Sequence, residues 1–140
     1  MQNFIFQNTT KLIFGKGSIA SLANAIPSTA RLLLVFGGGS VRTNGVYDQV
    51  IASLSLHTTT EFWGIEPNPT VETIRKAVLV GKDCRADYVL AIGGGSVLDA
   101  VKLIACAIPS NDDAWQLVLN GKLIKNPLPF ASVMTLPATG

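Results

Sequence analysis

The chain has 140 residues, of which 48% are hydrophobic and only 14% are charged, and its formal net charge is +2 at pH 7. This small charge, without a basic stripe, gives no indication of nucleic-acid binding, and no apolar run reaches the ~18 residues of a membrane-spanning helix. We also expect no secretory signal, because the first residues lack a basic region followed by a long apolar core. With two isolated cysteines, the composition predicts a cytoplasmic protein with free thiols that forms one domain over residues 1–140.

The first part of the chain predicts two strands and two helices in alternation. Residues 11–14 have strand character. Ser18 then stands at the start of a helical stripe of apolar residues that Pro27 ends. The apolar run 32–36 predicts a strand buried on both faces of a sheet, and the helical spacing of apolar residues over 46–54 predicts the next helix.

The same alternation continues through the rest of the chain. Residues 58–63 are rich in β-formers and predict a strand, and a loop with two prolines follows at 64–69. Thr70 is placed to cap the next helix. Residues 88–92 predict another buried strand, and 130–136 predict a last strand after a mainly irregular polar segment.

This alternation of strand and helix is typical of an α/β fold with a doubly wound, mainly parallel sheet of the Rossmann type. Such a sheet carries helices on both faces, with right-handed crossovers. Its ligands bind beyond the carboxyl ends of the strands. The functional residues are therefore expected at the carboxyl ends of the strands.

Two of the predicted strands end in the same motif, Gly-Gly-Gly-Ser, at residues 37–40 and 93–96. Glycines let the backbone approach a ligand closely, and a helix N-terminus offers unpaired N–H groups and the positive end of a dipole. We expect both turns at one edge of the sheet, with Ser96 capping the second helix and Asp99 completing that cap. Two such turns predict a ligand with more than one phosphate, and a dinucleotide is the first candidate. A tight structural turn is the alternative for each motif taken alone.

The residues after the first glycine run bear on which dinucleotide would bind. The strand end offers no acidic residue of the kind that holds the ribose 2′-hydroxyl in NAD enzymes. Ser40 and Arg42 instead offer a hydroxyl and a guanidinium, which suit a 2′-phosphate, although Arg42 reads equally well as a surface residue. Asp99 and Lys102 lie on one helix face. They are either near the reacting end of the cofactor or a capping acid with a surface ion pair.

No group of residues has the spacing of a metal site. His57 is the single histidine and lies at a predicted helix end, so we interpret it as structural. Cys84 and Cys106 are far apart in the sequence. We interpret Trp63 and Trp115 as core or interface residues rather than stacking platforms.

Four segments resemble the iron-containing (group III) alcohol dehydrogenases. They are Lys-Leu-Ile-Phe-Gly-Lys-Gly at 11–17, Gly-Ile-Glu-Pro-Asn-Pro at 64–69, Gly-Gly-Gly-Ser-Val-Leu-Asp at 93–99 followed by Lys102, and Thr-Leu-Pro-Ala-Thr-Gly at 135–140. They cover essentially the whole chain in order, and they resemble most the branch of NADPH-dependent aldehyde reductases of the butanol-dehydrogenase type. Many relatives carry Asp where Gly38 stands here, which implies a site with room for NADP.

The resemblance implies a two-domain enzyme that transfers hydride between NADP(H) and a small primary alcohol or aldehyde. Residues 1–140 would form the cofactor-binding domain. An all-helical domain beyond residue 140 would supply Asp and His ligands to Fe²⁺ or Zn²⁺, which polarises the alcohol oxygen during hydride transfer. We therefore expect no metal ligand and no activity in the 140-residue chain alone, and a homo-oligomer for the full-length enzyme.

Transferred by motif, the resemblance also implies contacts along the whole cofactor. The adenosine ribose and its 2′-phosphate would lie at Gly37, Gly38 and Ser40, the adenine near Asn68 and Pro69, the pyrophosphate at Gly94, Gly95 and Ser96, and the nicotinamide half near Asp99, Thr135 and Thr139.

Two other functions stay open at this point. Dehydroquinate synthase and glycerol-1-phosphate dehydrogenase share the second Gly-Gly-Gly-Ser turn, but their substrates carry phosphate or several carboxylates. A non-catalytic nucleotide-binding module is the alternative from a different functional class.

Overall fold

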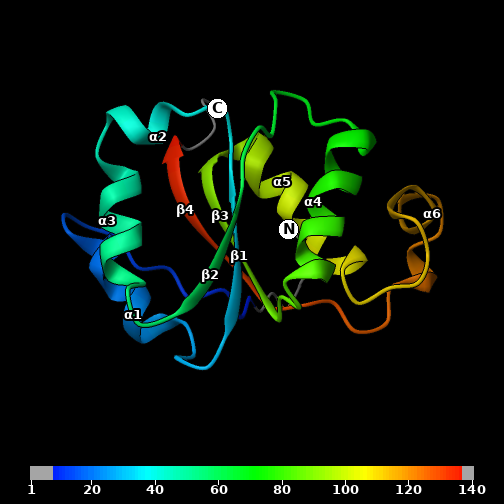
Figure 1. Cartoon of the computed structure of the whole chain (residues 1–140), viewed down its shortest axis with the longest axis horizontal. Coiled ribbons are helices and arrows are strands. Elements are labelled where there is room, and N and C mark those ends of the chain that lie inside the picture. The colour runs from blue at the N-terminus through cyan, green and yellow to red at the C-terminus, as the bar shows by residue number, and fades with distance from the viewer. Residues whose placement is uncertain (1–7, 137–140) are drawn as a thin grey trace, which may run out of the picture.

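Four parallel strands in the order β2-β1-β3-β4 form the centre of the molecule (Figure 1). The computed structural model describes residues 8–136. The strands are β1 (Arg31–Phe36), β2 (Thr58–Phe62), β3 (Tyr88–Gly94) and β4 (Phe130–Leu136). The predicted parallel α/β fold is confirmed.

Helices cover both faces of this sheet (Figure 1). One face carries α4 (Val71–Asp83), α5 (Gly95–Ala107) and α6 (Ala114–Leu119), which a 3₁₀ turn at Gly121–Leu123 follows. The other carries a 3₁₀ turn at Ser18–Ser21, α1 (Leu22–Ala25), α2 (Ser40–Thr43) and α3 (Val46–Ser53). No helix in this described part of the chain is long and apolar enough to cross a membrane.

Strand β1 joins the two halves of the core. Leu32, Leu34 and Phe36 pack on the side of α1–α3, whereas Leu33 and Val35 pack on the side of α4–α6. All five side chains are at most 1% exposed. Burial of each stabilises the fold by roughly 1.5–3 kcal/mol, which explains why this strand is a continuous apolar run rather than an alternating one.

The predicted strand at 11–14 is wrong. This run pairs with no described strand, and Leu12 and Phe14 are 84% and 95% exposed. A strand needs a hydrogen-bonding partner along its length, which apolar content does not supply. The predicted first helix forms only as the 3₁₀ turn and the single turn of α1, and Ser18 makes no capping bond there.

The connections diverge between β1 and β3. After β1 the chain passes to α2 and α3 on one face, and after β3 it passes to α5 on the opposite face. These two strands are neighbours in the sheet, so their carboxyl ends lie side by side while their connections separate. In open α/β sheets this arrangement leaves a crevice in which ligands bind.

Candidate functional site

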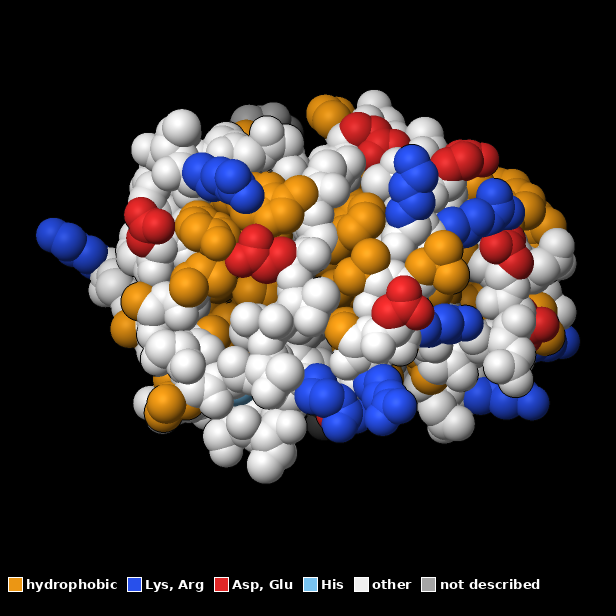
Figure 2. Space-filling model, viewed as in Figure 1, with side chains coloured by type: hydrophobic (Ala, Val, Ile, Leu, Met, Phe, Trp, Pro, Cys, Tyr) orange, Lys and Arg blue, Asp and Glu red, His pale blue; other side chains and the backbone are white. Residues whose placement is uncertain are grey.

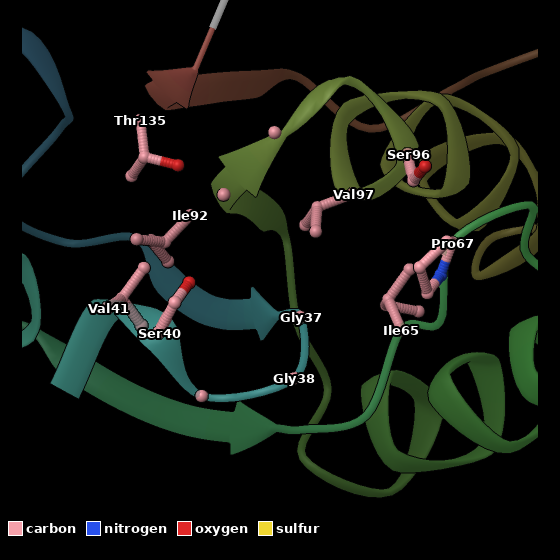
Figure 3. A pocket seen from close by; sticks show the side chains of 13 residues that line it. Gly37, Gly38, Ser40, Val41, Ile65, Pro67, Ile92, Ser96, Val97 and Thr135 are labelled. Carbon is pink, nitrogen blue, oxygen red and sulfur yellow. The ribbon is translucent and has the colours of Figure 1, made fainter. Parts of the chain in front are cut away.

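A cavity of about 170 Å³ lies at this crevice, and both Gly-Gly-Gly-Ser turns contribute to its wall (Figure 3). The expectation that the two turns share one edge of the sheet is therefore confirmed. The lining residues are Gly37, Gly38, Gly39, Ser40, Val41, Ile65, Pro67, Ile92, Gly93, Gly94, Ser96, Val97 and Thr135.

The first turn is tied to the loop that follows β2. The Gly64 N–H donates to the carbonyl of Gly37 at 3.3 Å, and the Ile65 N–H donates to the carbonyl of Phe36 at 3.1 Å. The turn then reverses at Gly39, whose φ of 104° lies in the left-handed region, and α2 begins at the next residue. Figure 3 shows the Ser40 side chain directed toward the space between this turn and the end of β4.

The second turn is shaped by Gly93. Its φ is 157°, and a Cβ at this position would lie 2.7 Å from Val97 Cγ2. Both the backbone conformation and the close approach of Val97 therefore require glycine here. Strand β3 runs through this residue to Gly94, which is two residues further than the sequence predicts.

Helix α5 begins without a side-chain cap. Gly94 is the N-cap residue and has an extended conformation, and α5 starts at Gly95. The prediction that Ser96 caps α5 is wrong, because the N-cap is Gly94, two residues earlier, and Ser96 lies in the first turn of the helix, where it lines the cavity. The N–H groups of this turn have no side-chain acceptor, and the positive end of the α5 dipole stands at the cavity.

The Gly-Ile-Glu-Pro-Asn-Pro loop forms another part of the wall through Ile65 and Pro67. Glu66 fixes this loop to the start of α4. Its Oε1 accepts hydrogen bonds from the Thr70 N–H at 3.0 Å, from the Thr70 hydroxyl at 2.8 Å and from the Thr73 hydroxyl at 2.9 Å. The largest cause of a lowered pKa is a hydrogen bond from the N–H of Glu66 itself. Together with the bonds from Thr70 and Thr73, it lowers the pKa of Glu66 from 4.5 to about 2. As predicted, Thr70 caps α4 by accepting from the Thr73 N–H.

The remaining predicted cofactor residues differ in whether they line the cavity. Thr135 lines it from β4, and Figure 3 shows this side chain directed toward the same space as Ser40. Gly95, Asn68 and Pro69 belong to the same turn or loop as lining residues but do not line the cavity themselves. Thr139 lies outside the described residues.

Asp99 does not line the cavity. Its Oδ1 accepts from Lys102 Nζ at 2.9 Å, and both side chains are more than half exposed. Asp99 makes no capping bond at the start of α5. Of the two alternatives, the structure therefore shows the surface ion pair. A role of Asp99 near the reacting end of the cofactor stays a prediction.

An aromatic cluster adjoins the first glycine turn. Trp63 stacks on Phe36 with ring centroids 4.0 Å apart, and the Arg42 guanidinium lies 4.0 Å from the Trp63 ring centroid on this cluster. Glu61 accepts hydrogen bonds from the Tyr47 hydroxyl at 2.8 Å and from Trp63 Nε1 at 2.7 Å. The bond to Glu61 is the main cause that raises the pKa of Tyr47, which keeps its proton as donor. Trp63 is thus both packed on the core and a platform for a cation.

Among residues 8–136, no group of three or more His, Cys, Asp or Glu could hold a metal ion. His57 Nε2 lies 3.4 Å from the carbonyl oxygen of Ile26. The histidine lines a second cavity of about 620 Å³ between α1 and α3, near the amino ends of the strands. Ligands of parallel sheets bind at the carboxyl ends of the strands, so the smaller cavity is the candidate functional site.

Sequence reasoning missed several lining residues. Gly39 and Gly93 lie inside the two motifs, and their required conformations are not visible from composition. Val97 directly follows the second motif, and its β-branched side chain was the available signal. Ile65 and Pro67 belong to a segment that the sequence analysis assigned to the adenine side through Asn68 and Pro69 only.

Comparison with known proteins gives a consistent result over the whole chain. Residues 9–140 match the sequence profile of the family "Iron-containing alcohol dehydrogenase". The chain is 48% identical to the NADPH-dependent aldehyde reductase YqhD of Escherichia coli and 46% identical to the probable NADH-dependent butanol dehydrogenase 1 of Bacillus subtilis, each over 100% of this chain and 37% of the relative.

A solved structure agrees with these matches. The NADH-dependent butanol dehydrogenase A of Thermotoga maritima superimposes with a TM-score of 0.90 at 39% identity, over 99% of this chain and 36% of that protein. The chain thus spans 37% of the length of the two curated relatives above.

Both the backbone conformation and the Val97 contact require glycine at position 93, and the free energy of unfolding of a variant can test this requirement. We expect Gly93→Ala to lower the free energy of unfolding by about 1–3 kcal/mol through backbone strain, with the Val97 contact adding to this loss. Gly95→Ala is the matched control, because nothing lies within 4 Å of a Cβ there, and it should be neutral or slightly stabilising. Urea denaturation measures both, and equal stability of the two variants would contradict the account of this turn.

The Glu66 network predicts a specific dependence of stability on pH. The pKa of Glu66 is lower in the folded chain than in the unfolded chain, so its contribution is present above pH 4.5 and is lost as the pH falls toward about 2. Glu66→Gln should remove part of the acid destabilisation, and Asp113, whose pKa Arg75 lowers to about 2, should account for another part. Urea midpoints measured from pH 6 to pH 2 test this. The control Glu72→Gln alters the first turn of the same helix and should keep the full pH dependence.

Proposed function

This chain belongs to the iron-containing alcohol dehydrogenases, and from that membership we propose that it forms the cofactor-binding part of an oxidoreductase. The proposed reaction is hydride transfer between NADP(H) and a primary alcohol or aldehyde. The observation that carries the proposal is the cavity between the two glycine turns at the divergence of the sheet. The names of the relatives, an aldehyde reductase and butanol dehydrogenases, support the substrate class.

The second glycine turn suits the pyrophosphate of a dinucleotide. The first turn of α5 has no side-chain cap, so its N–H groups are available to phosphate oxygens, and the helix dipole favours their negative charge. Gly94 and Gly95 let the pyrophosphate approach the backbone, and the Ser96 hydroxyl adds a donor at the cavity wall. Phosphate binding would replace the missing cap.

The first glycine turn suits the adenosine half. In our proposal Gly37, Gly38 and Ser40 surround the ribose, and the loop that holds Asn68 and Pro69 lies beside the adenine. The Glu66 bonds to Thr70 and Thr73 fix this loop to the start of α4, beside the place proposed for the adenosine half.

The nicotinamide half would extend toward β4, where Thr135 reaches the cavity wall. Asp99 and Thr139 are proposed on the same side. The bound nicotinamide supplies the hydride donor or acceptor. The role proposed for this part of the chain is to bind and orient the ring.

The family name implies a metal, but the described residues include no group of three or more His, Cys, Asp or Glu that could hold one. We propose that the ligands for Fe²⁺ or Zn²⁺ belong to a helical domain, in the part of the relatives' length that this chain does not span. A homo-oligomer and a cytoplasmic location also stay proposals from the sequence.

The choice between NADP and NAD is the finer part of the proposal. Relatives of nearly equal identity are named for NADPH and for NADH, so we argue it from the site. A Cβ at Gly38 would have no atom within 4 Å, which leaves space at the mouth of the cavity. No acidic side chain occupies this space, which favours a ribose that carries a 2′-phosphate.

Gly38→Asp should reverse this preference. The open surroundings accept the side chain, and its charge should repel the 2′-phosphate while it can bind a free 2′-hydroxyl. We expect the affinity for NADP⁺ to fall roughly tenfold to a hundredfold, the equivalent of the ~1.5–3 kcal/mol of a charge-assisted contact. Calorimetric titration with NADP⁺ and NAD⁺ measures the change.

Gly38→Asn is the control, because it has the shape of aspartate without the charge, and it should weaken NADP⁺ binding less. If the unmodified protein binds NAD⁺ as tightly as NADP⁺, the preference proposed here is wrong.

A further inference from the structure

The aromatic cluster beside the first glycine turn holds the Arg42 side chain in place. The guanidinium lies 4.0 Å from the centroid of the Trp63 ring and 5.6 Å from that of Tyr47. Trp63 in turn stacks on Phe36 with an angle of 8° between the ring planes, and Phe36 is fully buried in the core. The arginine is therefore the outermost layer of a stack that starts inside the protein.

Glu61 fixes the orientation of the middle layer. One of its carboxylate oxygens accepts from Trp63 Nε1, and the other accepts from the Tyr47 hydroxyl. Both oxygens are thus engaged by aromatic donors. Neither is within ion-pair distance of Arg42.

Arg42 differs in this respect from Arg31 and Arg75. Arg31 pairs with Asp87, and Arg75 forms a two-bond contact with Asp113. In the part of the chain that the structure describes, the Arg42 guanidinium has no hydrogen bond and no ion pair. A ring face attracts the guanidinium without using its N–H groups, so all of its donors stay available at its edge.

The position of the stack relates these donors to the cofactor site. Arg42 lies two residues after Ser40, which lines the cavity, and its own N–H donates to the Gly39 carbonyl. Trp63 directly precedes Gly64, whose N–H bonds to Gly37. Arg42 and Trp63 are therefore both connected to the first glycine turn, through the chain itself and through these backbone hydrogen bonds. Figure 2, in the same view as Figure 1, shows exposed hydrophobic side chains bordered by charged ones over the part of this face where α2 and α3 lie.

We propose that Trp63 is a positioning residue for cofactor specificity, because it holds the side chain of Arg42, four residues after Gly38, with free donors for the 2′-phosphate of NADP. This inference rests on the proposed function. A planar guanidinium with unused donors is the group that recognises phosphate oxygens best. A stacked arginine also loses less side-chain freedom when phosphate binds than a free one.

The test compares two probes that differ only in the 2′-phosphate. These are 2′,5′-ADP and 5′-AMP, and their dissociation constants are measured by calorimetry on the full chain. For Trp63→Leu we expect the constant for 2′,5′-ADP to rise roughly threefold to tenfold, the range of a lost cation–π contact, while that for 5′-AMP stays within about twofold. A merely structural role would weaken both probes alike.

A double-mutant cycle identifies the route through Arg42. Arg42→Met alone should raise the constant for 2′,5′-ADP, and adding Trp63→Leu to it should cause no further rise. Trp115→Leu changes the chain's other tryptophan, which is 47% exposed on α6, and should leave both probes unaffected. Trp63→Phe keeps an aromatic face but loses the bond to Glu61. It should give a smaller loss in the same direction, and it replaces the leucine variant if that variant does not fold.

The inference is overturned if Trp63→Leu weakens both probes equally, if it changes neither, or if its effect adds in full to that of Arg42→Met. Failure of the proposed function would look different. In that case the unmodified chain would bind neither probe, or would bind 5′-AMP as tightly as 2′,5′-ADP.

Discussion

The packing of one side chain, Val97 of α5, against both glycine turns determines how closely this helix approaches the ends of β1 and β3. Val97 Cγ2 would lie 2.7 Å from a Cβ at Gly93 and 3.3 Å from one at Gly37. Any larger residue at these places would push α5 away from the sheet. The cavity, the start of α5 and the position of the first turn therefore all depend on this contact.

The site around this contact contains two kinds of group: side chains and loops that the protein holds in place, and backbone N–H groups that have no side-chain acceptor. The Glu66 network holds the loop after β2, and the Trp63 stack holds the side chain of Arg42. The N–H groups at the start of α5, in contrast, have no side-chain acceptor. A phosphorylated ligand would supply the missing acceptors, so a preformed frame surrounds the groups that a dinucleotide would satisfy.

The sequence predicted the sheet well because its central strands are buried on both faces. Residues 32–36 and 88–92 are apolar for that reason, and the two glycine motifs mark their ends. The strand predicted at 11–14 was wrong, because strand character in a sequence does not show whether a pairing partner exists. The cap predicted at Ser96 was wrong as well, since the start of α5 depends on the extended backbone of Gly94 rather than on the preference of serine for N-cap positions.

The contacts that define the site in detail could not be predicted, because they join residues from separate elements. Arg42 meets Trp63 only when α2 and β2 are placed beside each other. Val97 meets Gly37 only when the parallel sheet has formed. Both depend on the register of β1 with its two neighbours, which composition and spacing do not determine.

The central claim is that a dinucleotide binds between the two glycine turns. The most direct test is to follow the backbone amide resonances of the ¹⁵N-labelled chain by NMR while NADP⁺ is added. The account predicts saturable shifts concentrated at residues 37–40 and 94–97, with little change around His57 in the larger cavity. Shifts centred on that larger cavity, or no saturable shift at either glycine turn, would contradict it.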